Sequence, residues 1–146
     1  MQRLRCQHEC LNVLLEVPDR QILVKRPAPE KWHIVDQVAH LVAYQHVFAG
    51  RIHEILCQDN PAFPRYVGDN DPLFLERRNE SPDDLLVDLS ADRQYLYEWI
   101  CSLEPDQLRR TATHPVYGER SLLLWSEFFL LHEAHHCFTI FKLSSL

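Results

Sequence analysis

Apolar side chains recur at helical intervals through a long proline-free stretch that begins at Trp32 and ends at Cys57. A helix places side chains three, four and seven residues apart on one face, because each turn contains about 3.6 residues. Six apolar residues follow this spacing, namely Val35, Val38, Val42, Ala49, Ile52 and Leu56. The pattern predicts a helix over residues 32–57 that directs this face into a core.

Start and stop signals predict two more helices. The opening segment predicts a helix over residues 2–17, which stops because Pro18 lacks a backbone N–H group. In "SPDDLL", Ser81 is placed to cap a helix, a proline suits the first helical position, and Asp84 completes a capping box. This signal predicts a third helix over residues 82–103.

A serine also precedes the last apolar stretch. Ser121 is placed to cap a fourth helix that runs to about residue 142. With 146 residues, 46% of them hydrophobic, and only three glycines, the chain can bury one core and favours helices over a sheet rich in tight turns. We therefore expect an all-α four-helix bundle that forms a single domain over residues 1–146.

Two polar segments connect these helices. Residues 58–80 hold three prolines, a glycine and the run "GDND", and they are longer than the connections usual in compact domains. This link is predicted to carry a short helix or to form a flap over a site. Residues 104–120 are expected to be a polar connection with a turn at "HPVYG".

Composition restricts the partners and the compartment. The net charge of −6 opposes attraction to phosphate backbones, so nucleic acid is not an expected partner. No stretch has the length and apolarity of a signal peptide or a membrane span, so no membrane partner is expected.

The five cysteines are scattered and odd in number, which is typical of reduced thiols in a cytoplasmic protein. Cys6 and Cys10 lie one helical turn apart and are interpreted as small buried side chains rather than as a metal pair.

Histidines concentrate in the predicted last helix, in "LLHEAHHCFTIFKL". His132 and His136 stand about 40° apart on a helix, so both imidazoles can reach one metal ion beside it. His135 points to the other flank and is a weaker candidate ligand. The alternative is that these are partly buried imidazoles bonded to carbonyl groups or water.

The run "HEAHH" also fits H-E-x-x-H, the zinc metalloprotease pattern in which the glutamate is the general base. The ten residues that follow contain no histidine, aspartate, glutamate or tyrosine to supply a third ligand, so the protease interpretation is disfavoured. Two interpretations of Glu133 remain: it orients a histidine or shuttles a proton in the site, or it is a surface carboxylate.

Arg93 also has two interpretations, since it either reaches an anionic substrate or lies on a solvated face. Tyr117 can shape the mouth of a pocket.

A third ligand must come from earlier in the chain, and the predicted second helix offers four histidines. These are His33, His40, His46 and His53. His40 lies in mid-helix among small and apolar neighbours, whereas the others lie nearer the ends or beside polar residues. Spacing alone does not select His40, because a lone helical histidine can equally be solvated or bonded to a carbonyl group.

Three motifs in order resemble the DinB/YfiT-like superfamily of metal-dependent hydrolases and thiol-dependent transferases. They are "KWHIVDQVAHL", "SPDDLLVDLSADRQYLYEWI" and "HPVYGERSLLLWSEFFLLHEAHHCF". The resemblance implies an up-down-down-up four-helix bundle, often dimeric, with one divalent metal held by three histidines. On this chain the implied ligands are His40, which precedes Leu41, and the pair His132 and His136. Tyr44 stands where relatives often have a polar or acidic residue.

The resemblance also implies a function. We expect a metal-dependent enzyme that acts on a small molecule by thiol transfer or by hydrolysis, with a low-molecular-weight thiol as a possible partner and a homodimer as the assembly. Zinc or nickel is the favoured ion, and iron, manganese and cobalt are also compatible with three imidazoles. The alternative is a non-catalytic, metal-stabilised bundle that serves in binding or stress response.

Overall fold

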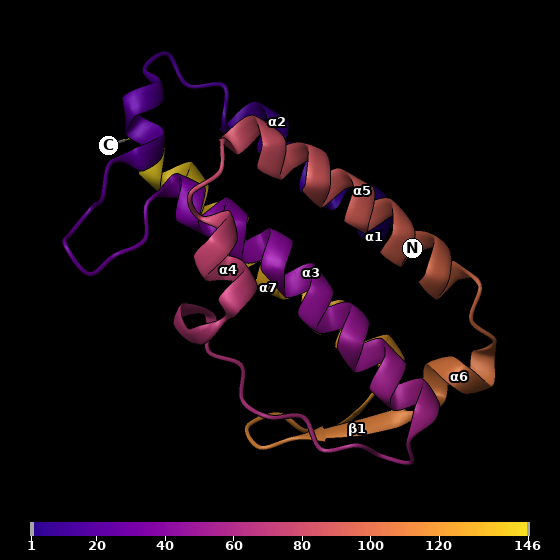
Figure 1. The fold of residues 1–146 in the computed structure, drawn as a ribbon. Helices are drawn as coiled ribbons and strands as arrows, with labels where there is room; N and C mark the ends of the chain where they lie inside the picture. Colours follow the sequence, from indigo (N-terminus) through magenta and orange to yellow (C-terminus); the bar gives the residue numbers. More distant parts are fainter. Residues whose placement is uncertain (1, 146) are drawn as a thin grey trace.

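Four helical rods run along the long axis of the molecule (Figure 1). The computed structural model describes residues 2–145. The first rod is composite, and the other three are continuous helices. Their bounds are α1 (Gln2–Cys6), the 3₁₀ turn η1 (Gln7–Glu9), α2 (Cys10–Leu14), α3 (Ile34–Cys57), α5 (Pro82–Cys101) and α7 (Leu122–Leu143). The predicted all-α four-helix bundle is confirmed.

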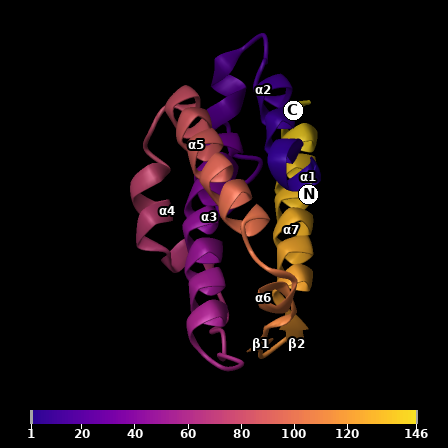
Figure 2. The ribbon, with the colours of Figure 1, turned by 90° about the vertical axis from the view of Figure 1, so that its right-hand side faces the viewer.

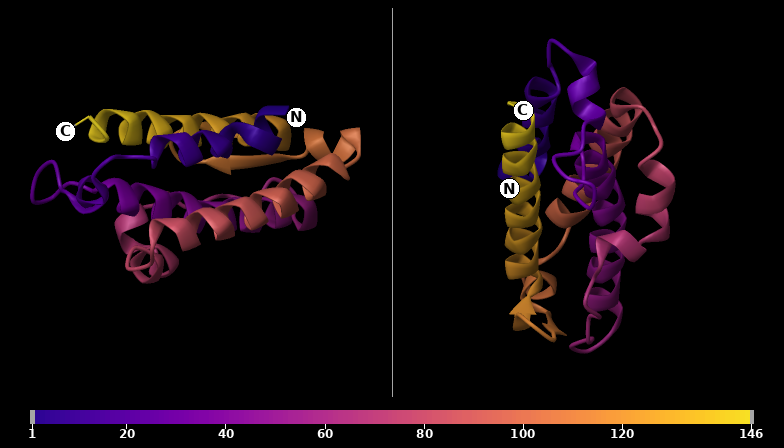
Figure 3. Two further views of the ribbon diagram at one scale, coloured as in Figure 1. Left: turned by 90° about the horizontal axis from the view of Figure 1, so that it is seen from above. Right: turned by 90° about the vertical axis from the view of Figure 1, so that its left-hand side faces the viewer.

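The rods form two layers, with α1, α2 and α7 in one and α3 and α5 in the other (Figure 3). Helices α3 and α5 are neighbours that run in the same direction, so the chain must cross back between them (Figure 2). The crossover is the link after α3, which contains η3 (Gly68–Asn70) and the short helix α4 (Pro72–Arg77). The path is therefore up-down-down-up, and the predicted short helix in the link is confirmed.

The predicted serine caps are present. The Ser81 hydroxyl accepts a hydrogen bond from the Asp84 amide at 3.1 Å, and the Ser121 hydroxyl accepts one from the Leu124 amide at 3.3 Å. Both satisfy amides that a helix start leaves without partners. The Asp84 carboxylate accepts from the Ser81 hydroxyl at 2.7 Å rather than from the Ser81 backbone, so the capping box is only half formed.

The first rod is not the continuous helix predicted over residues 2–17. It tightens into a 3₁₀ turn at Gln7–Glu9 and its α-helical part ends at Leu14. The turn is held by contacts to two other rods, because Gln7 Nε2 donates to the Leu130 carbonyl at 2.8 Å and His8 is buried beside Arg93. The remaining 3₁₀ segment, η2 (Arg20–Val24), leads into the connection to α3.

The segment before α7 holds more structure than the predicted polar connection. It contains α6 (Pro105–Arg109) and an antiparallel hairpin of β1 (Thr111–His114) and β2 (Gly118–Ser121), in which Thr111 pairs with Ser121. The hairpin closes one end of the bundle (Figure 1). The start of the link adds to it, since the Phe63 amide donates to the Thr113 carbonyl at 2.8 Å.

Apolar packing between the layers supplies the core. Among the fully buried side chains are Leu11, Ile34, Ile52, Leu89 and Leu122, which come from all four rods. Of the five free cysteines only Cys137 is buried, so the interpretation of Cys6 and Cys10 as buried side chains is wrong. None of the described helices combines the length and apolarity needed to cross a membrane.

Candidate metal centre

Three histidines from two rods meet inside the bundle. His40 comes from α3, and His132 and His136 come from consecutive turns of α7. The Nε2 atom of His132 lies 3.1 Å from Nε2 of His40 and 3.1 Å from Nε2 of His136. One potential ligand atom from each ring lies within 4.8 Å of the others. The structure thus brings together the three histidines that the sequence singled out.

The spacing of these nitrogens fits a shared ion. Two imidazole nitrogens that each lie about 2.0–2.1 Å from one divalent ion stand roughly 3 Å apart in neighbouring coordination positions. Hydrogen bonding alone accounts for the triplet less well, because Nε2 of His132 carries one proton or one lone pair but approaches two ring nitrogens. The three nitrogens therefore fit a divalent metal ion.

Burial keeps the three imidazoles neutral. It is the largest cause that lowers the pKa of His40 to about 4, of His132 to about 3 and of His136 to about 2, and the other histidines of the cluster lower the last two further. Burial disfavours the imidazolium because the charge loses its hydration. Each imidazole consequently keeps one unprotonated ring nitrogen at neutral pH, as a metal ligand must.

These shifted pKa values predict that acid destabilises the metal-free protein. Histidines in the unfolded chain take up protons near their ordinary pKa of 6.5, whereas the lowered pKa values of the folded imidazoles mean that they do so only at lower pH. Stability is therefore full above about pH 6.5 and declines as the pH falls, by roughly 2 kcal/mol per histidine at pH 5. Urea unfolding at pH 7 and pH 5, with His132→Gln for comparison, measures this loss. An equal loss in the variant would contradict it.

An aromatic wall and the link enclose His40, which is 3% exposed. The Trp32 ring packs against His40 with centroids 5.0 Å apart, and the Tyr44 ring lies 4.1 Å from that of His132. Gly68 of the link leaves no room for a side chain, since a Cβ atom there would stand 3.0 Å from Nδ1 of His40 and 2.8 Å from Trp32. The predicted flap over the site is confirmed.

Gln37 fixes the orientation of one histidine, a role that the sequence analysis missed. Its Oε1 atom lies 2.6 Å from Nδ1 of His136, so it can accept a hydrogen bond from the Nδ1–H group and leave Nε2 with the lone pair that binds a metal. Within residues 2–145 the Nδ1 atoms of His40 and His132 are buried without a hydrogen-bond partner. The spacing held a signal, because Gln37 precedes His40 by three residues and shares its helix face.

Replacing Gln37 with leucine is expected to weaken metal binding about 10- to 100-fold while the fold is retained. The leucine fills a similar volume but cannot accept a hydrogen bond from His136 Nδ1–H, so the ring loses its fixed orientation. Competition against a chromophoric chelator measures the affinity. Gln94→Leu, an exposed change on α5, is the matched control. Unchanged affinity in Gln37→Leu would remove this role.

Glu133 and Arg93 form a buried ion pair away from the three nitrogens. Glu133 is 1% exposed and Arg93 is 0% exposed, so the surface interpretations of both residues are wrong. The carboxylate contacts two Arg93 nitrogens and accepts from Gln7 Nε2 at 3.0 Å. Within residues 2–145 the Glu133 carboxylate thus bonds to Arg93 and Gln7 and to none of the three histidines. His135 is exposed and lies outside the cluster.

A pocket of about 270 Å³, here called the inner pocket, borders the cluster at His132. Residues from α3, the link, the hairpin and α7 line it: Tyr44, Arg51, Arg65, Tyr66, His114, Val116, Tyr117, Phe128 and His132. Tyr117 is half exposed and stacks on His114, as expected for a residue at the pocket mouth. The cluster is therefore accessible from one side.

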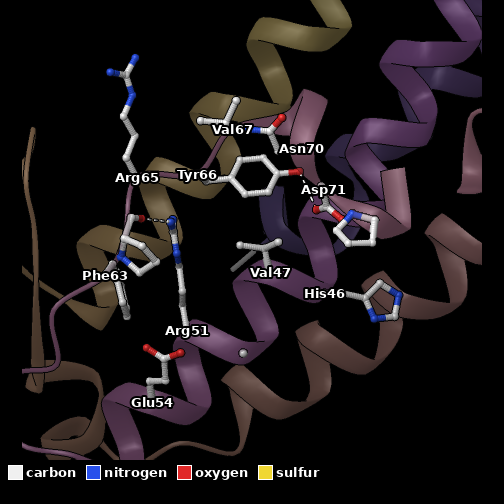
Figure 4. A pocket seen from close by; sticks show the side chains of 13 residues that line it. His46, Val47, Arg51, Glu54, Phe63, Arg65, Tyr66, Val67, Asn70 and Asp71 are labelled. Atoms are coloured by element: carbon white, nitrogen blue, oxygen red, sulfur yellow. Dashed lines mark hydrogen bonds between the residues drawn. The ribbon is translucent and has the colours of Figure 1, made fainter. Parts of the chain in front are cut away.

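A larger outer pocket of about 480 Å³ lies beyond the inner one and contains none of the three histidines. Three residues, Arg51, Arg65 and Tyr66, line both pockets. Figure 4 shows Arg51 rising from α3 to the link, where its guanidinium donates to the Pro64 carbonyl at 3.2 Å, while Arg65 extends away. The Tyr66 hydroxyl donates to Asp71 at 2.8 Å.

The fold and the cluster together define an up-down-down-up helical bundle with an internal three-histidine cluster. The family model of the DinB superfamily matches residues 4–140, so the chain belongs to the DinB superfamily. A solved structure, YfiT from Bacillus subtilis, is similar to it with a TM-score of 0.85 at 21% identity, over 99% of this chain and 83% of YfiT. YfiT is described as a probable metal-dependent hydrolase with an unusual four-helix bundle topology. Comparison with curated proteins found no match.

Proposed function

We propose that the chain is a metal-dependent enzyme that transfers a small thiol to an electrophile, with a divalent ion held by His40, His132 and His136. The observation that carries this proposal is the convergence of the three Nε2 atoms beside the inner pocket. Three neutral imidazoles leave the ion its full charge and at least one open coordination position. A small molecule in the inner pocket can reach that position past His132.

A divalent ion in such a site lowers the pKa of a bound thiol or water, so that the nucleophile is available at neutral pH. The protein residues supply the surroundings. Gln37 orients His136, and Trp32 and Gly68 close the side of His40 that faces the link. Tyr44 packs on His132 and directs its hydroxyl group to Arg51, which donates to it at 3.0 Å.

The lining of the inner pocket favours thiol transfer over hydrolysis. Hydrolysis benefits from a general base that takes a proton from water, and a carboxylate often serves. No aspartate or glutamate lines this pocket among residues 2–145, and Glu133 is paired with Arg93. Thiol transfer would need no carboxylate base, because a divalent ion held by the three histidines would keep a bound thiol as its thiolate, with the thiol proton released to solvent. A sulfur–carbon bond then forms, the bond from that carbon to the leaving group breaks, and a proton from solvent neutralises the leaving group.

The test uses the zinc- or nickel-loaded protein, a small thiol and a chromogenic aryl halide, with thioether formation as the readout. Acceleration by the loaded protein, absent from metal-free protein and from His132→Gln, supports the proposal. Acceleration of 4-nitrophenyl acetate hydrolysis instead would replace thiol transfer by hydrolysis. If the ion binds tightly but neither reaction is accelerated and no thiol reaches the ion, the non-catalytic alternative is correct.

We place zinc or nickel in the site because neutral imidazole ligands suit both ions, although iron, manganese and cobalt bind to similar sets. Metal analysis of protein purified without a histidine tag decides which ion is retained. The free thiols Cys6, Cys10, Cys57, Cys101 and Cys137 support a cytoplasmic location, where such thiols remain reduced. Fractionation of the source cells tests that location.

We also infer that the chain forms a homodimer through the outer face of α7. Leu124, Leu131 and Phe138 recur every seven residues on this face and are each more than half exposed. Large apolar side chains exposed along one helix face are typical of an interaction surface, and a homodimer buries the same face on both copies. Light scattering of the wild type should give twice the chain mass, and Leu131→Glu should give a monomer. A monomeric wild type would refute the dimer.

A further inference from the structure

The inner pocket contains an arginine that is buried without a counter-charge. Arg51 is 8% exposed, and both of its hydrogen bonds go to neutral oxygens. It donates to the Tyr44 hydroxyl at 3.0 Å and to the Pro64 carbonyl at 3.2 Å. Among residues 2–145 no carboxylate lies within ion-pair distance of its guanidinium, and neutral oxygens do not offset the loss of hydration of a full charge.

The other deeply buried arginine is handled differently by the fold. Arg93 is fully buried and pairs directly with the equally buried Glu133. The protein thus neutralises the buried arginine that lies away from the pocket and leaves the one beside the pocket unpaired. An unpaired buried cation at a pocket wall is a site where a ligand can supply the missing negative charge.

The other charged side chain that lines the inner pocket is also positive. Arg65 also lines it, and no aspartate or glutamate does so among the described residues. The pKa of His114, on the hairpin side of the pocket, is lowered by burial and further by Arg51 and Arg65. A net charge of −6 on the whole chain makes this concentration of positive charge a local property of the pocket.

Within the proposed function, we propose that the inner pocket binds an anionic group of the substrate, such as a carboxylate or sulfonate, through Arg51. The Tyr44 hydroxyl accepts from Arg51 and so keeps its own proton for the same anion. The pocket borders His132, so a molecule anchored on Arg51 can extend its reactive group to the metal centre. A volume of about 270 Å³ suits a compact molecule with its anionic and reactive groups a few bonds apart.

The test compares small thiols of similar size that differ in charge. Cobalt-loaded protein is titrated with 2-mercaptoethanesulfonate, 2-mercaptoethanol and cysteamine, and binding is followed by the sulfur-to-cobalt absorption band. A sulfonate coordinates metals weakly, so any preference for it reports on the protein. We expect the anionic thiol to bind about 10- to 100-fold more tightly than the neutral one, and the cationic thiol to bind most weakly.

Three variants locate the source of this preference. Arg51→Met should remove it, Arg51→Lys should retain part of it, and Arg109→Met, an exposed change on α6, should leave it intact. An unaltered cobalt spectrum before thiol addition shows that the three-histidine cluster of each variant is undisturbed. If the wild type binds neutral and anionic thiols equally, or if Arg51→Met keeps the preference, the anion site is refuted.

A second readout separates this proposal from the proposed function. Ethanesulfonate, which has the anion without the thiol, is expected to raise the Tm of metal-free wild type but not that of Arg51→Met. If this shift occurs while no thiol reaches cobalt, the anion site stands and thiol transfer fails. If thiols reach cobalt but ethanesulfonate and the charge series give no effect, thiol binding at the metal centre stands and the anion site fails.

Discussion

Replacing Glu133 with leucine is expected to destabilise the folded protein by about 3–5 kcal/mol, because the change leaves the Arg93 guanidinium buried without a partner. Both side chains are almost fully inaccessible, and Gln7 and Gln45 complete their hydrogen bonds. Urea unfolding at pH 7 measures the loss of stability. An effect below about 1 kcal/mol would mean that the pair is solvated in solution.

The double variant Arg93→Met/Glu133→Leu gives the matched comparison. It removes both charges and fills the site with apolar side chains, so it should recover most of the stability lost in Glu133→Leu. Asp106→Asn, which removes an exposed partner of Arg109, should hardly change stability. The double variant should also retain its metal, since neither residue belongs to the three-histidine cluster. If a stable double variant lost its metal, the ion pair would be needed for metal binding, and Glu133 would have to be counted as part of the site.

Replacing His132 with glutamine is expected to weaken metal binding by more than the roughly 10- to 100-fold expected for Gln37→Leu, because a ligand is lost rather than its support. His132 is the central member of the cluster, with its Nε2 atom 3.1 Å from both other nitrogens. His40→Gln and His136→Gln should behave alike. Competition with a chromophoric chelator gives the affinities.

His135→Gln is the control for this series. It changes an exposed histidine three residues after His132 and outside the cluster, so the metal affinity should match that of the wild type. If His135→Gln lost the metal while His132→Gln retained it, His135 would be the ligand in place of His132. That result would contradict both the proposed ligand set and the H-E-x-x-H interpretation, because both require His132. If all four histidine variants bound the metal as tightly as the wild type, the ion would have to lie outside the three-histidine cluster.

The long helices were predictable because their signals are local. Serine caps and apolar spacing depend on residues within a few turns, and Ser81 and Ser121 begin helices as expected. The hairpin was missed because its strands have four residues each and Ala112 is the only apolar side chain in either of them. Its stability comes from pairing with the link near Phe63, which is distant in the sequence.

The candidate site was predictable only in part. The spacing of His132 and His136 identifies a pair on one helix face, because that geometry is local. Selection of His40 required the family resemblance, since its proximity depends on how α3 packs against α7. The burial of Glu133 could not be inferred, because a glutamate is buried only where a partner neutralises it, and Arg93 lies on another rod.

Elemental analysis of the untagged protein, after incubation with zinc or nickel and removal of loosely bound ions, tests the central claim most directly. Convergence of His40, His132 and His136 predicts about one tightly held ion per chain. A correctly folded protein that retains no ion from either solution would contradict the account.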